Sequence, residues 1–268
     1  MYPRKARVVA VRVLDDLGYA AELAHAPRRV VSLVPSLTEA IAATCPEVLV
    51  GATDWCTHPE GLAVQRVRGT KNPNLRTIRE LRPDLVVANK EENRQLDVER
   101  LRAAGIPVWV TDIETVSQAL TSMRRLFVEA LGLGVPGWLA AAEAEWAGPA
   151  PQPRARVAIA IWRDPWMVVG SSTYTGDLVA RLGWDNVFSD HSDRYPHVDL
   201  AELDRDDLDA VLLPDEPYVF TERDGPEAFT RTWPVLCSGR LLTWYGPAMV
   251  GAREALSSLV RLSGGRTP

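Results

Sequence analysis

The sequence predicts an α/β fold built from two Rossmann-like lobes, with mostly parallel sheets and a connecting helix between them. Short apolar runs such as residues 30–34 and 84–88 are typical of strands that are buried on both faces. Segments with apolar residues at helical spacing follow these runs. Residues 132–153 are rich in Gly and Pro and interrupt the alternation, which then restarts. We therefore expect an N-terminal lobe at 1–131, a connector at 132–153 and a C-terminal lobe at 154–268.

Local signals place the elements of the first lobe. Pro35 ends the first core strand, and Ser36 with Glu39 forms a capping box that predicts a helix start. Gly105 stands where a helix ends in the left-handed conformation. A turn at 15–18 predicts a hairpin. The expected strands are 8–13, 20–23, 30–34, 48–51, 84–88 and 107–110, and the expected helices are 37–44, 75–81, 92–104 and 116–131.

The same reasoning places the elements of the connector and the second lobe. We expect the connecting helix at about 136–146, and Pro247 favours the first turn of a final helix. The acidic run 204–209 is typical of a solvated helix face. The expected strands are 157–162, 208–213 and 240–243, and the expected helices are 175–182, 226–230 and 247–262.

Composition excludes several classes of protein. The net charge is -5, and no stripe of basic and aromatic residues is present, so we expect no nucleic-acid partner. No apolar run approaches the 18 or so residues that a membrane span needs. The three cysteines, Cys45, Cys56 and Cys237, form no CxxC pair and suit a reducing compartment. No apolar segment follows the basic residues near Met1, so we expect a cytoplasmic location, or a periplasmic or lipid-anchored one if a leader is removed.

The loops after the predicted strands carry the candidate ligand-binding residues. Ligands bind open α/β sheets at the carboxyl ends of the strands. Nine tryptophans against four phenylalanines also favour a binding surface. Lys71, Lys90 and Arg163 would supply positive charge, and the aromatic residues would supply stacking area. The candidates are Pro35, Ser36, Trp55, Cys56, His58, Lys71, Asn72, Lys90, Glu91, Trp162, Arg163, Trp166, Tyr195, Glu216, Tyr218, Trp244 and Tyr245.

Each candidate group has an alternative interpretation. Cys56 and His58 are a possible metal pair, with a third ligand from Glu91, Glu92, Glu216 or His191, or less plausibly a nucleophile and its base. That alternative is a cytoplasmic metal-binding chaperone or an enzyme. Lys90 and Glu91 also fit a solvated helix start, and Trp162 and Trp166 fit a cap over the core. The sequence contains no GxGxxG, Walker A, GxSxG or HExxH motif, which lowers the expectation of catalysis.

Several segments resemble one known family in order and spacing. Residues 29–39, RVVSLVPSLTE, and residues 75–86, LRTIRELRPDLV, carry most of the resemblance. Residues 104–108 and 170–188, which end in GWDNVF, extend it over nearly the whole chain after about residue 12. These segments resemble the class III substrate-binding proteins of ABC importers, the receptors for vitamin B12, siderophores and haem with a TroA-like, helical-backbone fold.

The resemblance implies a receptor that holds a small molecule between its two lobes and catalyses no reaction. The implied ligand is a corrinoid or metal chelate, no intrinsic cofactor or metal site is implied, and an ABC permease is the implied partner. Lys71 stands where the B12 receptors have an aromatic residue, whereas Tyr195 matches an expected aromatic position. The family's docking acids align with Arg76 and with Ala201, beside Glu202, so a typical docking surface is not evident.

Overall fold

The chain forms two compact units. In the computed structural model, residues 11–260 are described. Within the described residues, unit 1 comprises 11–112 and 121–140, and unit 2 comprises 113–120 and 141–260. The division between the units therefore falls inside α4 (Val116–Arg125) and inside α5 (Gly137–Glu145). The three-part domain organisation drawn from the sequence stays a prediction.

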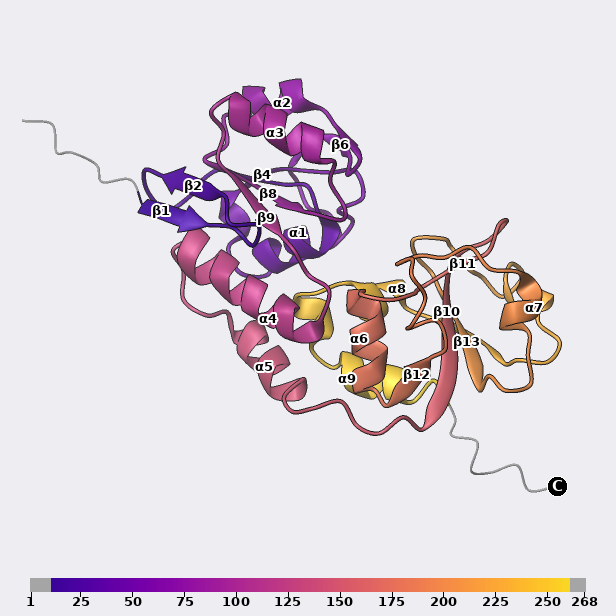
Figure 1. Cartoon of the computed structure of the whole chain (residues 1–268). Helices are drawn as coiled ribbons and strands as arrows, with labels where there is room; N and C mark the ends of the chain where they lie inside the picture. The colour runs from indigo at the N-terminus through magenta and orange to yellow at the C-terminus, as the bar shows by residue number, and fades with distance from the viewer. Residues whose placement is uncertain (1–10, 261–268) are drawn as a thin grey trace, which may run out of the picture. The chain divides into compact units, whose positions relative to one another are not determined.

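Unit 1 contains a parallel sheet of five strands in the order β5-β4-β3-β8-β9. Val31, Val86 and Val108 point to one face of the sheet, where they pack with Ile78 and Leu101 from the two helices on that side. In Figure 1, α2 and α3 lie on one side of the sheet, and α1 and α4 lie on the other. The elements are β3 (Val30–Ser32), β4 (Leu49–Ala52), β5 (Gln65–Arg66), β8 (Leu85–Asn89), β9 (Val108–Thr111), α1 (Pro35–Ala42), α2 (Leu75–Glu80) and α3 (Gln95–Ala103).

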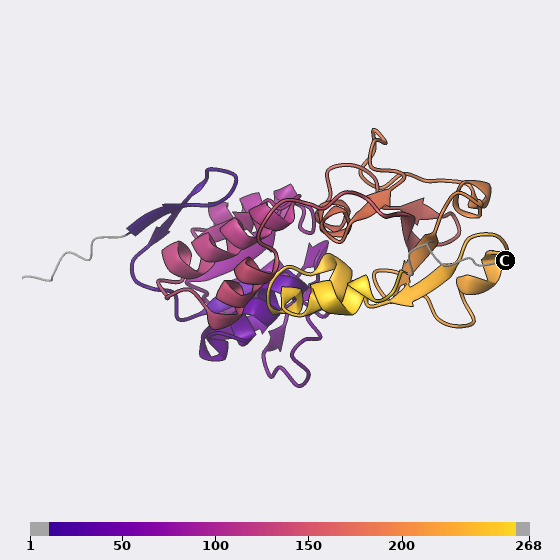
Figure 2. The same ribbon diagram turned by 90° about the horizontal axis from the view of Figure 1, so that it is seen from below.

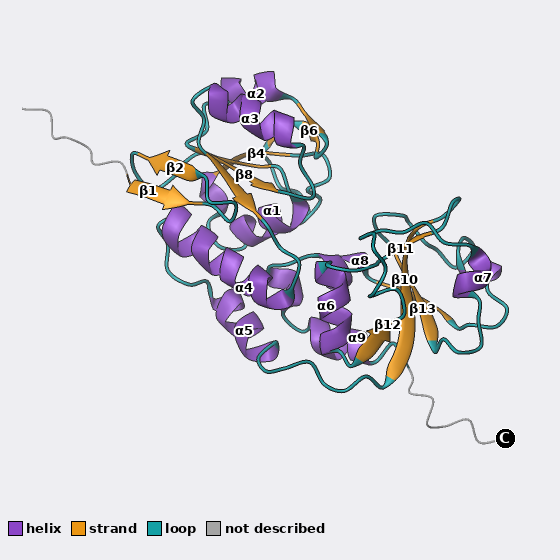
Figure 3. Ribbon diagram, viewed as in Figure 1, coloured by secondary structure: helices purple, strands orange, loops and turns teal. Residues whose placement is uncertain are grey.

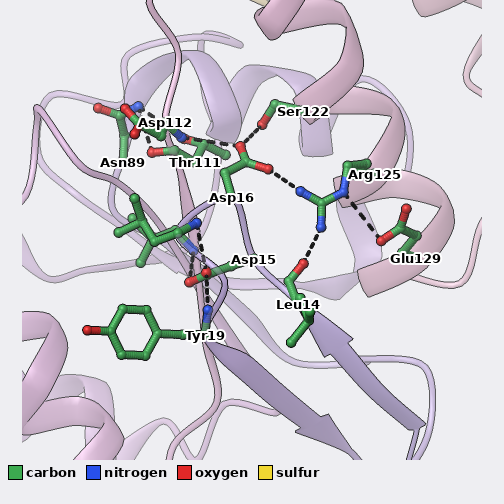
Figure 4. Close-up of polar contacts among 12 residues, drawn as sticks. Leu14, Asp15, Asp16, Tyr19, Asn89, Thr111, Asp112, Ser122, Arg125 and Glu129 are labelled. Atoms are coloured by element: carbon green, nitrogen blue, oxygen red, sulfur yellow. Dashed lines mark hydrogen bonds and ion pairs between the residues drawn. The ribbon is translucent and has the colours of Figure 1, made fainter.

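The predicted hairpin is confirmed by β1 (Val11–Leu14) and β2 (Ala20–Leu23), which pair antiparallel. Residues 8–10 of the predicted strand lie outside the described part. Figure 4 shows how the turn between these strands joins β9: Asp15 Oδ2 accepts from the amide of Val110 at 3.3 Å, and Asp16 Oδ2 accepts from the amide of Asp112 at 3.2 Å. The Asp15 carboxylate thus satisfies an amide on the edge strand β9, and the Asp16 carboxylate satisfies the amide of the residue that follows this strand.

Unit 2 contains a second parallel sheet, in which β10 pairs with β12 on one side and with β13 on the other, and β13 pairs with β14. A short strand, β11, returns antiparallel to β10. In Figure 1, α6 and α9 lie on one side of this sheet and α7 on the other, and Figure 2 gives the view from below. The elements are β10 (Ala155–Trp162), β11 (Met167–Val168), β12 (Trp184–Asn186), β13 (Ala210–Pro214), β14 (Pro234–Cys237), α6 (Tyr174–Arg181), α7 (Leu200–Leu203), α8 (Gly239–Thr243) and α9 (Ala252–Ser257).

Short helical turns complete the two units. A π-helix, η2 (Leu126–Ala130), continues α4. A two-stranded pair, β6 (Arg68–Gly69) with β7 (Asn72–Pro73), stands apart from the main sheet of unit 1. Figure 3 shows that long loops occupy much of unit 2. The remaining 3-10 turns are η1 (Pro46–Val48), η3 (Pro226–Ala228) and η4 (Pro247–Met249).

Four local predictions are wrong. The helix expected at 247–262 is interrupted, because Gly251 at φ +78° separates η4 from α9, and residues 261–262 lie outside the described part. Ser36 does not cap α1, because Pro35 takes the first helical position and the N-cap is Val34. Residues 240–243 form a helix rather than a strand, because the side chain of Ser238 accepts from the amide of Leu241 and begins α8 one residue after β14 ends. The acidic run at 204–209 is not helical, since α7 ends at Leu203.

Candidate functional site

In unit 1, the carboxyl ends of the parallel strands meet at one edge of the sheet. The loop after β4 carries Trp55, whose residue surface is 65% exposed. Arg66 holds this loop, because its Nη1 donates to the carbonyl oxygens of Thr53 and Cys56, both at 2.9 Å. The amide of Asp54 donates to the carbonyl of Arg68 at 2.9 Å. Trp55 is thus an exposed indole on a loop whose backbone is fixed on both sides.

Cys56, next to Trp55, faces the opposite way and is fully buried. Its sulfur lies 3.0 Å from Thr38 Oγ1 and 3.1 Å from Thr53 Oγ1. Burial raises the pKa of the thiol, which keeps it protonated. This burial gives no support to Cys56 as a group that presents its thiol to a ligand or a metal, and its place in the binding site stays a prediction. His58 is half-exposed and lies 3.2 Å from Thr57 Oγ1.

Two buried asparagines shape the loop after β8. Asn89 Oδ1 accepts from the amides of Glu91 and Glu92 at 2.8 and 3.1 Å, and Asn93 Oδ1 accepts from the amide of Asn89 at 2.9 Å. Asn93 Nδ2 also donates to the carbonyl of Thr70 at 3.0 Å. The side-chain amide of Asn93 therefore joins this loop to the loop that carries the candidates Lys71 and Asn72.

The two candidate lysines of unit 1 already have protein partners. Lys90 Nζ lies 2.7 Å from Asp112 Oδ2, and Lys71 Nζ donates to the carbonyl oxygen of Glu91. Both lysines are exposed, so their ammonium groups still face solvent. The structure places Asn72 and Glu91 on the surface, whereas Ser36 is buried in α1 and Pro35 begins that helix.

In unit 2, β10 ends at Trp162, which is 44% exposed. The edge of its ring meets Tyr218, with ring centroids 5.4 Å apart and an interplanar angle of 76°. Trp166 behaves differently: it is buried and packs against Phe220 and Phe229 at centroid distances of 5.9 and 5.5 Å. The structure thus brings Trp162 and Tyr218 together near the strand end and puts Trp166 in the core.

Arg163 does not present a free positive charge. Its Nη1 donates to carboxylate oxygens of both Asp224 and Glu227, and its Nε lies 3.6 Å from Asp164 Oδ2. These bonds raise the pKa of the guanidinium and lower that of Glu227. Because three carboxylates surround this guanidinium, its charge is already compensated within unit 2, and a contact between Arg163 and an anionic ligand stays a prediction.

Glu216 follows β13 and packs tightly against the start of α8. A Cβ on Gly239 would stand 2.3 Å from Glu216 Cγ, so only glycine fits there. Burial raises the pKa of Glu216, and hydrogen bonds from Trp244 and Thr243 oppose that rise. Within the described residues, Glu216 Oε1 is buried without a hydrogen-bond partner. Glu216 is thus better suited to fixing the loop than to meeting solvent.

The remaining aromatic candidates are more enclosed. Trp244 and Tyr245 are 7% and 6% exposed, and Tyr245 packs edge-on against Tyr174 at a centroid distance of 5.7 Å. Tyr195 is half-buried in a loop that packs against Gly170, whose amide donates to the carbonyl of Arg194 at 2.8 Å.

Several residues that are not among the candidates predicted from the sequence hold the candidate residues in place. Arg66, Asn93 and Asp224 are the main ones, and each acts on partners that are distant in the chain or in another loop. Asn89 gave a usable signal, because an asparagine at a strand end commonly accepts from the amides two and three residues on. No such local signal marks Arg66 or Asp224.

No group of three or more His, Cys, Asp or Glu residues suited to a metal ion occurs among residues 11–260. In the same part of the chain, no helix has the length and apolar composition needed to cross a membrane. Together with the burial of Cys56, the first finding gives no support to a metal-binding chaperone or an enzyme based on Cys56 and His58.

Comparison with known proteins supports the resemblance drawn from the sequence. No family model matches the chain. Proteins named vitamin B12-binding protein from Pectobacterium atrosepticum and Salmonella typhimurium are each 28% identical, over 70% and 67% of this chain and 71% and 69% of their own length.

Solved structures extend the comparison to the fold. The periplasmic vitamin B12 binding protein BtuF of Vibrio cholerae has a TM-score of 0.68 at 18% identity, covering 87% of this chain and 96% of its own. The periplasmic heme-binding protein RhuT from Roseiflexus has a TM-score of 0.71 at 21% identity, covering 86% and 98%. The chain has the fold of a class III substrate-binding protein.

This result confirms the predicted α/β class and the class III resemblance. At these identities the solved structures speak for the fold alone. The expectation of a cytoplasmic location finds no support, because BtuF and RhuT are both described as periplasmic.

Proposed function

We propose that this chain is a small-ligand receptor of the class III type, which binds a corrinoid or a related metal chelate and catalyses no reaction. The named sequence relatives are B12-binding proteins, and the solved structures include B12- and heme-binding proteins. These ligands share a wide, flat ring system. A receptor for such a ring needs exposed aromatic side chains held in fixed positions.

The observation that carries this proposal is one exposed tryptophan at the strand ends of each unit. Trp55 follows β4 in unit 1, and Trp162 ends β10 in unit 2; they are 65% and 44% exposed. An exposed indole on a well-fixed loop has no stabilising role in the core, whereas it offers a broad apolar face to a flat ligand. We propose that Trp55 and Trp162 each offer a stacking face at the strand ends of their own unit, with Lys71 and Lys90 exposed in the loops of unit 1.

Thermal shift with defined probes tests this function. We expect cyanocobalamin, hemin or a ferric siderophore to raise the melting temperature, because a ligand that binds only the folded state stabilises it by mass action. Trp55→Ala and Trp162→Ala should each weaken binding of the active probe by about tenfold or more in calorimetry. Trp233→Ala is the matched control, since Trp233 is 45% exposed but precedes β14 rather than following a strand.

The proposal fails if no probe raises the melting temperature of the wild-type protein. It also fails if Trp233→Ala weakens binding as much as Trp55→Ala and Trp162→Ala do. We also expect the bound probe to be chemically unchanged after long incubation with the protein. Conversion of the probe to a product would contradict a function limited to binding.

A location outside the cytoplasm and a permease partner are further parts of the proposal. BtuF and RhuT are both described as periplasmic, which supports the location. The permease partner rests on the resemblance to the binding proteins of ABC importers. Arg76 is exposed and pairs with Glu80 at 2.8 Å, so a permease that docks here would meet a basic and an acidic group together. Fractionation of the source cells with an antibody against this chain tests the location.

A further inference from the structure

Trp162 lies beside a set of contacts that fix its neighbour, Tyr218. Tyr218 Oη donates to Asp224 Oδ2 at 2.6 Å, a short distance for a hydrogen bond to a carboxylate. The other oxygen of Asp224 accepts from Arg163, the residue that follows Trp162. Trp162 and Tyr218 also share a ring contact. Each of these four side chains therefore contacts the next, and the first and last of them are adjacent residues at the end of β10.

The segment that carries Asp224 is itself fixed to Arg163. Glu227 pairs with the guanidinium, and its Oε2 accepts from the amide of Gly225 at 2.6 Å. Gly225 has φ +124°, and a Cβ there would stand 2.6 Å from the ring of Phe220. Gly225 thus lets the backbone pass close to Phe220, a ring in the core of unit 2, which places the 224–227 segment directly against that core.

The short turn after Trp162 is fixed as well. Trp162 pairs with Met167 across β10 and β11, and Asp164 adopts φ +59° between them. Arg163 lies with its guanidinium carbon 5.6 Å from the centre of the Trp166 ring, which is part of the core of unit 2. Arg163 thus connects the turn to both the core and the 224–227 segment, and its side chain is 20% exposed.

We propose that Tyr218, Asp224 and Arg163 are positioning residues that hold the Trp162 ring in the orientation that receives the flat ligand. This inference rests on the proposed function and deepens it. Because the Tyr218 hydroxyl donates its proton to Asp224, its proposed effect on the ligand is exerted through the Trp162 ring. This positioning would increase affinity, because a side chain that is already ordered before binding loses less conformational entropy when the ligand binds.

A double-mutant cycle tests the proposal. With the probe that raises the melting temperature, Tyr218→Phe should weaken binding by about threefold to tenfold, because the ring stays but its hydrogen bond to Asp224 is lost. In a Trp162→Ala background, Tyr218→Phe should have no further effect. Tyr19→Phe is the control, since Tyr19 is exposed in the β1–β2 turn of unit 1. Equal weakening in both backgrounds would overturn the proposal.

A measurement without ligand separates this proposal from the proposed function. The difference in near-ultraviolet circular dichroism between the wild type and Trp162→Ala reports the order of Trp162. Tyr218→Phe and Asp224→Asn should each reduce that difference signal, with the melting temperature of the protein kept well above the measuring temperature. If the signal persists in both variants, Trp162 is not positioned by them. If the signal falls but no probe binds, only the receptor function fails.

Discussion

Arg102 Nη2 lies 2.6 Å from Asp15 Oδ2, and the side chain of Asp15 is completely buried. The same carboxylate accepts from the amides of Leu17, Tyr19 and Val110. Asp15 therefore joins the β1–β2 turn, α3 and the edge strand β9, as Figure 4 shows in part.

Replacing Arg102 by Ala should destabilise the protein by about 3–5 kcal/mol, because it leaves a buried carboxylate without its countercharge. Urea denaturation followed by far-ultraviolet circular dichroism measures this change. Arg76→Ala is the control, since its ion pair with Glu80 is exposed on both sides. Similar losses in both variants would contradict the role given to Asp15.

Acid should remove a stabilising contribution from Asp204. Partial burial acts to raise its pKa, but bonds from Thr230, Arg231 and Thr232 outweigh that and lower it from 3.8 to about 2. A carboxyl whose folded-state pKa is lowered contributes stability above its unfolded-state pKa and loses it as the pH falls through the folded value. Asp204→Asn should thus be less stable than wild type at pH 6.

The difference in stability between wild type and Asp204→Asn should shrink as the pH falls from 3.8 toward about 2, the interval set by the two pKa values. Melting temperatures at closely spaced pH values measure it. Asp164→Asn is the control, because the Asp164 side chain is 85% exposed. A stability difference between wild type and Asp204→Asn that stays constant or widens toward low pH would contradict this role of Asp204.

The thiols of Cys56 and Cys237 should resist modification in the folded protein. Burial raises the pKa of Cys56 and raises that of Cys237 to about 12, so little thiolate is present at neutral pH. A colorimetric disulfide reagent should react slowly with the native chain and fast in guanidinium chloride. Cys56→Ala should leave probe affinity and metal content unchanged; metal lost with that substitution would revive a metal site.

Gly239→Ala should destabilise unit 2 by about 1–3 kcal/mol, because the added methyl group would overlap Glu216 Cγ and two of its backbone atoms. Thermal and urea denaturation measure the loss. Gly134→Ala is the matched control, since a Cβ there meets nothing within 4 Å. Equal stability of Gly239→Ala and wild type would show that the loop after β13 can move away from α8.

The sequence predicted the alternating strands and helices well because their signal is local. Residues 85–88 are apolar throughout and form most of β8, and the apolar spacing after Val116 becomes α4. The prediction failed where two short elements follow each other closely. At residues 234–243, one strand and one helix are separated by Ser238 alone, and the apolar residues of the helix were assigned to a strand.

For the candidate site, the sequence indicated the loops that follow the strands but not the direction of each side chain. Trp55 and Cys56 are neighbours in one loop, yet one is exposed and the other buried. Trp162 and Trp166 differ in the same way on either side of the turn after β10. Residue type alone cannot decide this, because burial depends on what packs against the loop from elsewhere in the chain.

The sequence by itself determined that this protein has an α/β fold with aromatic and charged residues gathered after its strands, because apolar periodicity and strand-end composition act over a few residues. Only the tertiary structure decided which of those residues are available to a ligand. Arg163 has the charge for a binding role, but its partners Asp224 and Glu227 stand 61 and 64 residues later. An ion pair over that separation forms only when the fold brings the groups together, and it links Arg163 through Asp224 to Tyr218, which contacts the ring of Trp162.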